Sequence, residues 1–241
     1  MDFEALYDQY WLTKDDSADP VRLGIIAGKV KAGNRVLDVG GQIGLSALSL
    51  KERGATVTLT DISSVALERA RARGVPDVRK VDLDAEPLPF RKGIFDVVVS
   101  NSSLEHIFYP EKMISECARV LKINGTFILL VPNIAHIRYR LWLLAGRFPY
   151  KRNTPTDELH IRFMTLYEAK RLCGRYGLIT ERVDGNAGLW VNALYPGFLA
   201  KGFLASGYTW LARTFPSLFA RDFVLIARKD TGNDACRTAA Q

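Results

Sequence analysis

Short runs of β-branched residues alternate with helical patterns over the first half of the chain, and this alternation restricts the fold more than any other feature. The runs read as strands buried on both faces, at residues 35–39, 56–60, 78–81, 95–100 and 125–131. Apolar residues at helical spacing fill the gaps, at residues 45–53, 64–73 and 111–121. Because successive βαβ units build a parallel sheet, the sequence predicts an α/β, Rossmann-like doubly wound fold.

The second half of the chain changes character. Thr165 with Glu168 three residues later indicates the start of a helix, and strands are predicted at 178–183 and 222–229. A long apolar insertion, predicted to be a helical cap, precedes the last strand. We therefore expect one domain, residues 1–241. It has an N-terminal helical segment at residues 1–34, a linker or lid at 133–164, a cap insertion at 186–221 and a disordered tail at 230–241.

Composition excludes several classes of protein. With 241 residues, 48% hydrophobic and 24% charged, the chain has the make-up of a globular domain rather than a disordered or fibrous one. No apolar stretch approaches the ~18 residues of a membrane span, and the acidic N-terminus does not resemble a signal peptide. Cys117, Cys173 and Cys236 have no paired spacing, which indicates reduced thiols. We expect a cytoplasmic protein.

The net charge of +7 has a local origin. Residues 133–156 and 186–221 contain eight of the 33 basic residues, none of the 26 acidic ones and nearly half of the aromatic ones. Basic and aromatic residues together fit a surface that binds single-stranded nucleic acid or an anionic membrane interface. Of these two partners, the high aliphatic content of residues 186–221 favours the membrane. A nucleic-acid partner is therefore not expected. A lid over a substrate cleft, or an extra core layer, explains the same residues equally well.

A glycine-rich loop connects the first predicted strand to the first following helix. Residues 36–44 read VLDVGGQIG, and such a turn lets a ligand approach the backbone closely. Its glycines, Gly40, Gly41 and Gly44, do not match the spacing G-x-G-x-x-G, which disfavours a nicotinamide dinucleotide.

Three acidic residues lie at the carboxyl ends of predicted strands, where open sheets bind ligands. Asp38 precedes the glycine loop, and Asp61 ends the second strand, where a carboxylate can accept hydrogen bonds from a ribose diol. Asp82 ends the third strand and suits an adenine amino group, with Leu83 beside the ring. The alternative is an ordinary strand-to-helix turn whose aspartates only cap backbone groups.

These motifs, in this order, resemble the class I S-adenosylmethionine-dependent methyltransferases from about Val36 to Thr165. VLDVGGQIG is similar to the family's first motif, TLTDIS to its ribose-binding acid, VDLDAEPLPF to its adenine loop, FDVVVSNSSLEHI to its fourth strand and ARVLKINGTFILLVPN to its fifth. The most similar branch acts on small molecules, and includes type 11, MetW-like, ubiquinone-methyltransferase-like and cell-envelope sugar or lipid methyltransferases.

The resemblance implies a seven-stranded, mostly parallel sheet with an antiparallel last strand, and an enzyme that uses S-adenosyl-L-methionine. It implies cofactor contacts from Asp38, Gly40, Gly41, Gly44, Asp61, Ile62, Asp82, Leu83, Asn101 and Ser102. Gln42 stands where the family has its middle glycine, and its side chain would crowd the methionine part of the cofactor unless Gly41 takes over the turn.

Methyl transfer is a displacement in which the enzyme mainly aligns the acceptor and excludes water. A hydroxyl acceptor must also lose a proton, for which histidine is the usual base. We expect His106 and His160 to be the catalytic candidates, with Glu105 and Arg162 as substrate contacts together with Trp142.

The alternative for Glu105 and His106 is a helix start anchored by hydrogen bonds. His136 is predicted to be a solvated lid residue. No metal is expected, because no further histidine or paired acid accompanies Glu105 and His106 at a recognisable spacing.

Three hypotheses of function follow. The first is O-methylation of a small-molecule acceptor, specifically a lipid-linked or cell-envelope glycoconjugate, by a protein that is cytoplasmic or peripheral at the inner face of the membrane. The second, motivated by Gln42, is a MetW-like partner subunit that is non-catalytic or senses the cofactor. The third is RNA methylation, motivated by the basic segments. No sequence feature encodes an oligomeric state.

Overall fold

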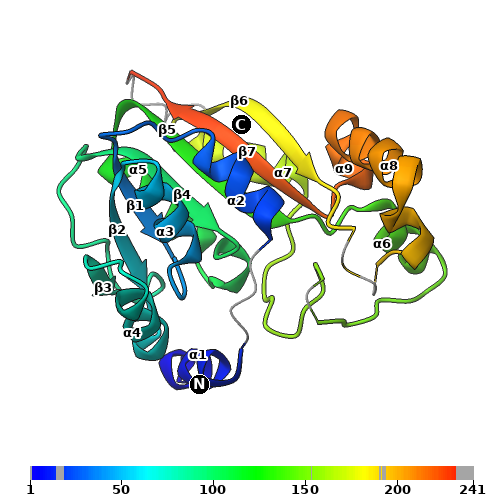
Figure 1. Cartoon of the computed structure of the whole chain (residues 1–241), viewed down its shortest axis with the longest axis horizontal. Coiled ribbons are helices and arrows are strands. Elements are labelled where there is room, and N and C mark those ends of the chain that lie inside the picture. Colours follow the sequence, from blue (N-terminus) through cyan, green and yellow to red (C-terminus); the bar gives the residue numbers. More distant parts are fainter. Residues whose placement is uncertain (1, 15–18, 153, 190, 192–193, 232–241) are drawn as a thin grey trace.

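The computed structural model describes residues 2–14, 19–152, 154–189, 191 and 194–231. Seven strands form one sheet in the order β3-β2-β1-β4-β5-β7-β6 (Figure 1). Only β7 runs antiparallel to its neighbours, which confirms the predicted sheet. The strands are β1 (Arg35–Val39), β2 (Thr56–Asp61), β3 (Val78–Lys80), β4 (Phe95–Asn101), β5 (Leu121–Pro132), β6 (Leu178–Asn186) and β7 (Asp222–Lys229).

Helices cover both faces of the sheet because its strands carry apolar residues on both sides. One face packs against α2 (Pro20–Ala27), α3 (Leu45–Glu52) and α4 (Ser64–Ala72), and the other against α5 (Pro110–Val120) and α7 (Leu166–Arg175) (Figure 1). The predicted capping residue of α7 is confirmed, since the Thr165 hydroxyl accepts a hydrogen bond from the Glu168 N–H at 3.2 Å.

The strand order reverses between β1 and β4, and this reversal creates the functional edge of the sheet. β1 pairs with β2 on one side and with β4 on the other, so successive crossovers leave in opposite directions. A crevice opens outside the carboxyl ends of such strands.

The N-terminal helix α1 (Phe3–Thr13) lies below this edge in Figure 1 and packs against α4. The Asp8 carboxylate accepts hydrogen bonds from the Ser63 hydroxyl and from the Val65 N–H at 3.1 Å, at the first turn of α4. The Arg69 guanidinium donates to the backbone carbonyl of Trp11. These contacts hold α1 beside the carboxyl ends of the strands.

The chain from β5 onward adds helices at one end of the molecule, at the right of Figure 1. They are α6 (Ile137–Leu144), η2 (Gly197–Ala200), α8 (Gly202–Thr214) and α9 (Pro216–Phe219). A small core joins them, formed by the buried residues Tyr139, Val191, Leu194 and Tyr195. The second half of the chain therefore builds a cap with a core of its own.

The prediction that His136 is solvated was wrong. His136 is buried, with Nε2 3.0 Å from the Tyr208 hydroxyl and 3.1 Å from that of Tyr195, while Nδ1 accepts from the Arg138 N–H at 3.2 Å. Since Nδ1 accepts a backbone N–H, Nε2 carries the proton and donates to a hydroxyl. His136 therefore helps to fix the cap.

Two further sequence expectations concern parts of this fold. Cys117 and Cys173 are free and buried, whereas Cys236 and most of the expected tail, residues 232–241, lie outside the described residues. Among the described residues, no helix has the length and apolar character needed to cross a membrane.

Candidate functional site

A cavity of about 510 Å³ lies at the carboxyl ends of β1, β2 and β4 and is bounded by α1. This volume is in the range of small-molecule and cofactor sites. Ten residues predicted from the sequence line it: Asp38, Gly40, Gly41, Asp61, Ile62, Asp82, Leu83, Asn101, Ser102 and His106. The fold thus brings together nine of the ten predicted cofactor contacts and one of the two predicted catalytic histidines.

Other predicted residues lie outside the cavity lining. Gly44 is the N-cap of α3. Arg162 is exposed and donates to the Phe108 carbonyl. Trp142 lies on α6, where the cations of Arg138 and Lys151 approach its ring at 5.0 and 5.1 Å from the centroid. Trp142 therefore takes part in the cap rather than in the cavity.

Sequence reasoning missed the contribution of the N-terminal segment. Phe3, Tyr7, Tyr10 and Trp11 of α1 line the cavity, as does Arg22 of α2. A signal was present, because the four aromatic residues stand at positions i, i+4, i+7 and i+8 of a helix and so share one helical face. That spacing fits core packing equally well, and only the position of α1 over the strand ends makes these residues part of a site.

The glycine loop has left-handed backbone at three positions, and one of them is not a glycine. Gly40, Gln42 and Gly44 have φ values of 63°, 55° and 82°. Gly41 does not take over the turn, because Gln42 itself adopts the conformation that favours glycine. Gly41 is needed for another reason: a Cβ there would lie 2.5 Å from Leu59 Cγ.

Replacing Gln42 with glycine is expected to stabilise the apoprotein by up to about 1 kcal/mol, since it removes left-handed strain at some cost in chain entropy. The Gln42 N–H already donates to Asp61 Oδ2 at 2.9 Å, so the backbone contact between the loop and Asp61 forms with glutamine present. Affinity for S-adenosylmethionine should change by less than about tenfold. Thermal unfolding and calorimetric titration measure both effects, and a hundredfold gain in affinity would instead support the partner-subunit hypothesis.

Two buried carboxylates give the cavity its electrostatic character. Neither oxygen of Asp38 has a hydrogen-bond partner among the described residues. Burial, followed by the nearby Asp61 charge, raises the pKa of Asp38 to about 7. Burial also raises the pKa of Asp61 to about 6. The backbone N–H groups of Ser63 and Gln42 act in the opposite direction, because they stabilise the carboxylate and lower its pKa.

This donor set fits S-adenosylmethionine. Its sulfonium and ammonium groups are cations. A nearby cation stabilises the charged form of a carboxylate, which burial alone destabilises. The unpartnered Asp38 oxygens can accept hydrogen bonds from a ligand, and Asp61 can accept them from a diol. The acids at this edge therefore suit the cofactor that the motifs imply.

His106 reaches the cavity in a defined tautomer. Its Nδ1 lies 3.0 Å from the carbonyl oxygen of Leu159. A carbonyl only accepts, so Nδ1 carries the proton and Nε2 keeps a lone pair. Burial, and then the neighbouring His160, lower the pKa of His106 to about 4, so the ring is neutral at physiological pH.

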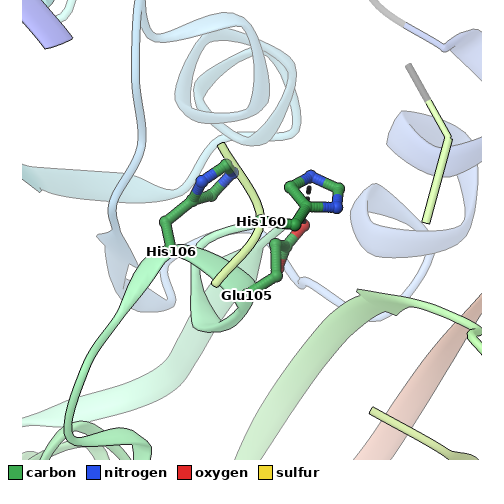
Figure 2. Close-up of side chains that lie close together, drawn as sticks. All are labelled: Glu105, His106 and His160. Atoms are coloured by element: carbon green, nitrogen blue, oxygen red, sulfur yellow. Dashed lines mark ion pairs between the residues drawn. The ribbon is translucent and has the colours of Figure 1, made fainter. Parts of the chain in front are cut away.

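His160 comes from the linker and meets the Glu105–His106 pair (Figure 2). Its ring centroid is 4.9 Å from that of His106, and its Nε2 is 4.0 Å from Glu105 Oε1. The three side chains can place one ligand atom each within 4.8 Å of one another. The reason for expecting no metal was therefore wrong, because the fold supplies a third residue that no local spacing shows; the absence of a metal stays a prediction.

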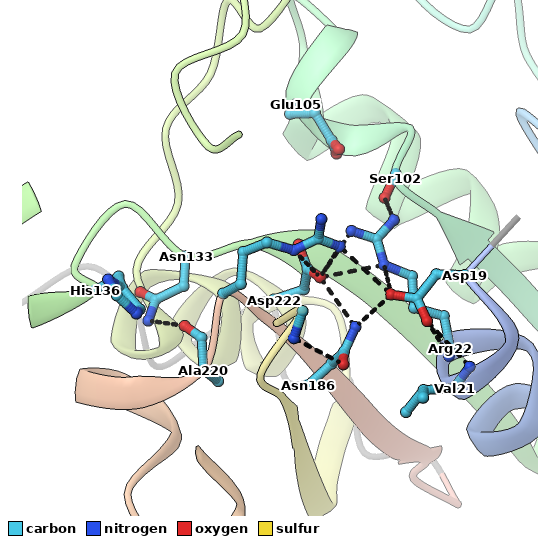
Figure 3. Close-up of polar contacts among 12 residues, drawn as sticks. Asp19, Val21, Arg22, Ser102, Glu105, Asn133, His136, Asn186, Ala220 and Asp222 are labelled. Carbon is cyan, nitrogen blue, oxygen red and sulfur yellow. Dashed lines mark hydrogen bonds and ion pairs between the residues drawn. The ribbon is translucent and has the colours of Figure 1, made fainter. Parts of the chain in front are cut away.

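Glu105 is buried and faces a polar network built around two arginines (Figure 3). The Arg22 guanidinium donates to the Ser102 hydroxyl at 3.2 Å and pairs with Asp222 at 2.7 Å. Neither carboxyl oxygen of Glu105 has a hydrogen-bond partner among the described residues. Burial raises its pKa to about 8, so this carboxyl group is largely protonated at neutral pH. Through its two contacts, Arg22 links Ser102, a cavity residue, to Asp222, the first residue of β7.

The raised pKa values predict that the apoprotein loses stability as the pH rises. The side chains of Glu105 and Asp38 each hold a proton in the folded state that the unfolded chain gives up near pH 4. As the pH rises from about 4 to the folded pKa of each group, that group therefore lowers the free energy of unfolding by up to ~1.4 kcal/mol per pH unit. Glu105→Gln should therefore gain stability over wild type as the pH rises from about 5 to 8. Urea unfolding at both values measures this gain.

Asp96→Asn is the matched control, because the Lys122 ammonium and the Arg35 N–H lower the pKa of Asp96. Loss of this carboxylate should destabilise the protein at pH 8. A Glu105→Gln variant that is less stable than wild type at pH 8 would contradict the assignment of a buried carboxyl group that no hydrogen bond from the described residues stabilises.

Comparison with known proteins gives consistent similarities. Residues 37–129 match the model of a methyltransferase domain family. The chain is 32% identical over 194 residues to a ubiquinone biosynthesis O-methyltransferase of Idiomarina loihiensis, an alignment that spans 76% of this chain and 80% of the relative. Its identity to the enzyme of that name from Nitrosococcus oceani is 26% over 193 residues, 76% and 82% of the two chains.

A solved structure shows the same fold. The S-adenosylmethionine-dependent methyltransferase of Mesorhizobium loti superposes with a TM-score of 0.60 over 89% of this chain and 99% of that one, at 21% identity. The structural similarity thus extends beyond residues 37–129, the segment that matches the family model.

Proposed function

The chain belongs to the class I S-adenosylmethionine-dependent methyltransferases, and from that premise we propose that it methylates a hydroxyl oxygen of a small amphipathic acceptor. One observation carries the proposal: the cavity has the strand-end acids on one side and the neutral His106, with a free Nε2 lone pair, on its lining. A neutral imidazole is the group that a hydroxyl acceptor needs as it loses its proton.

Each part of the cavity has an assigned task in this proposal. Asp61 accepts hydrogen bonds from the ribose hydroxyls, Asp82 and Leu83 hold the adenine, and Asp38 faces the positive charge of the cofactor. Bound S-adenosylmethionine supplies an activated methyl group. The aromatic residues of α1 exclude water from the cavity, and His106 takes the proton of the acceptor hydroxyl at Nε2.

The lining also favours an acceptor with apolar parts. Phe3, Tyr7, Ile107, Phe108 and Tyr109 belong to the lining, together with His106. We keep two acceptor classes that share a hydroxyl group and an apolar portion. One is an intermediate of ubiquinone biosynthesis, after the names of the relatives, and the other is a lipid-linked or cell-envelope glycoconjugate.

The test is transfer of labelled methyl groups from S-adenosylmethionine to fractionated lipid and sugar extracts and to hydroxylated quinone precursors. We expect a labelled product whose methyl group resists alkaline hydrolysis, as an ether does and an ester does not. The quinone and glycoconjugate arms separate the two acceptor classes. Labelling at nitrogen or of RNA, or no product in any arm although the cofactor binds, would contradict the proposal.

A further inference from the structure

The cap carries a surface that neither the cavity nor the cap core uses. Leu144 and Phe203 are 86% and 83% exposed, and Phe198 and Trp210 are each 62% exposed. Leu141 and Leu204 are exposed beside them. We define these six residues, together with the exposed cations Arg140, Arg147, Lys201 and Arg213, as the cap surface.

The exposed apolar residues follow the turns of their helices. On α8, Phe203 and Trp210 are seven residues apart, and the exposed Arg213 continues the same face three residues later. Tyr208 of α8 and Tyr139 of α6 point the other way, into the cap core. Both helices therefore have a buried aromatic face and an exposed face that carries apolar and basic residues.

The cap surface does not close the cavity. None of the described residues in 186–221 lines the cavity, and Leu159 is the one residue of 133–164 that does. The cap surface therefore forms no part of the described cavity lining, and a second role is compatible with the lid that the sequence allowed. It begins where β5 ends and closes where β7 begins, at the same edge of the sheet as the cavity. Figure 1 shows α6 and α8 at the end of the molecule beyond this edge.

Charge decides what this surface can contact. Residues 133–156 and 186–221 contain no acidic side chain, and the one deeply buried cation among them, Arg221, is already paired with Asp222. Two copies that met through the cap surface would bring like charges together. An anionic lipid bilayer instead attracts the cations and accepts Phe and Trp side chains at its headgroup level.

We propose that the cap surface docks the protein on an anionic lipid bilayer, with Phe198, Phe203 and Trp210 inserted at the interface and the cations against lipid phosphates. The helices are short: α6 has eight residues and α8 thirteen, so they lie on the bilayer rather than span it. The docked cap puts the cavity edge beside the membrane, where an amphipathic acceptor resides. The docking itself needs neither acceptor nor methyl transfer, so its test is separate from that of the proposed function.

The test is flotation of the purified full chain with vesicles of phosphatidylglycerol and phosphatidylcholine in equal parts, and with vesicles of phosphatidylcholine alone. We expect binding to the anionic vesicles that weakens as salt rises. The double variant Phe203→Ser and Trp210→Ser should bind at least tenfold more weakly, and Lys201→Gln with Arg213→Gln about thirtyfold more weakly, at ~1 kcal/mol per cation.

Matched controls come from α7, on the sheet away from the cap. Tyr167→Ser removes an aromatic residue that is 71% exposed, and Lys170→Gln with Arg175→Gln removes two exposed cations. Both controls should bind vesicles like wild type. The proposal would be overturned if the wild type did not bind, if it bound neutral vesicles equally well, or if the α7 controls lost as much binding as the cap variants. It would also be overturned if the protein did not bind vesicles but formed a dimer, and if the double variant Phe203→Ser and Trp210→Ser dissociated that dimer.

Discussion

Asp61→Asn should lower the affinity for S-adenosylmethionine about 100-fold, or about 2.7 kcal/mol, because the amide can accept only one of two hydrogen bonds from the ribose and carries no charge. The carboxylate lies at the end of β2 with a raised pKa, so its neutralisation removes a buried charge that the apoprotein holds at a cost. The variant should therefore fold and yet bind the cofactor about 100-fold more weakly. Calorimetric titration with S-adenosylmethionine and S-adenosylhomocysteine measures the loss.

The same substitution at the opposite edge of the sheet is the control. Asp96 accepts hydrogen bonds from the Arg35 N–H at 2.8 Å and from Lys122 Nζ at 2.6 Å, at the amino end of β4. Asp96→Asn should leave cofactor affinity unchanged. If Asp61→Asn binds the cofactor as tightly as wild type, the ribose does not lie at the end of β2.

Removal of His106 should lower kcat by ~10²–10⁴ and change cofactor affinity little, because the proton acceptor is lost while the strand-end acids remain. The His106→Asn variant separates a base from an anchor. Its amide can still donate to the Leu159 carbonyl as Nδ1 does, but it offers no basic nitrogen. We expect His106→Asn to be as inactive as His106→Ala.

The pH dependence gives a second measure of this role. The pKa of His106 is about 4, lowered by burial and by His160, so the imidazole is already neutral at pH 6. His106 should therefore cause no loss of kcat/KM as the pH is lowered from about 8 to 6. Recovery of most activity in His106→Asn would show that the hydrogen bond to Leu159, a structural role, is what the reaction needs.

The sheet was predictable because its signals are local. Each strand in the first half is a compact β-branched run, and the strand of residues 222–229 was located to the residue as β7. The positions of the aspartates at the strand ends were equally predictable, because the carboxyl ends of parallel strands all lie at the same edge of the sheet. Nine predicted cofactor contacts therefore line one cavity.

The remaining parts of the site depend on contacts between distant segments. Tyr7 reaches the cavity because α1 is held by Asp8 and Arg69, contacts that span more than fifty residues. His160 meets Glu105 through an irregular linker without periodicity. His136 looked solvated because its neighbours are basic, yet hydroxyl groups from Tyr195 and Tyr208 bury it. No local pattern contains these partners.

A crystal structure with S-adenosylhomocysteine tests the central claim, that the cavity between the strand ends and α1 is the methyl-transfer site. We expect both ribose hydroxyls within hydrogen-bond distance of Asp61, the adenine beside Leu83, and the sulfur directed toward the part of the cavity lined by His106. A ligand bound elsewhere, or one whose sulfur is directed away from His106, would contradict it.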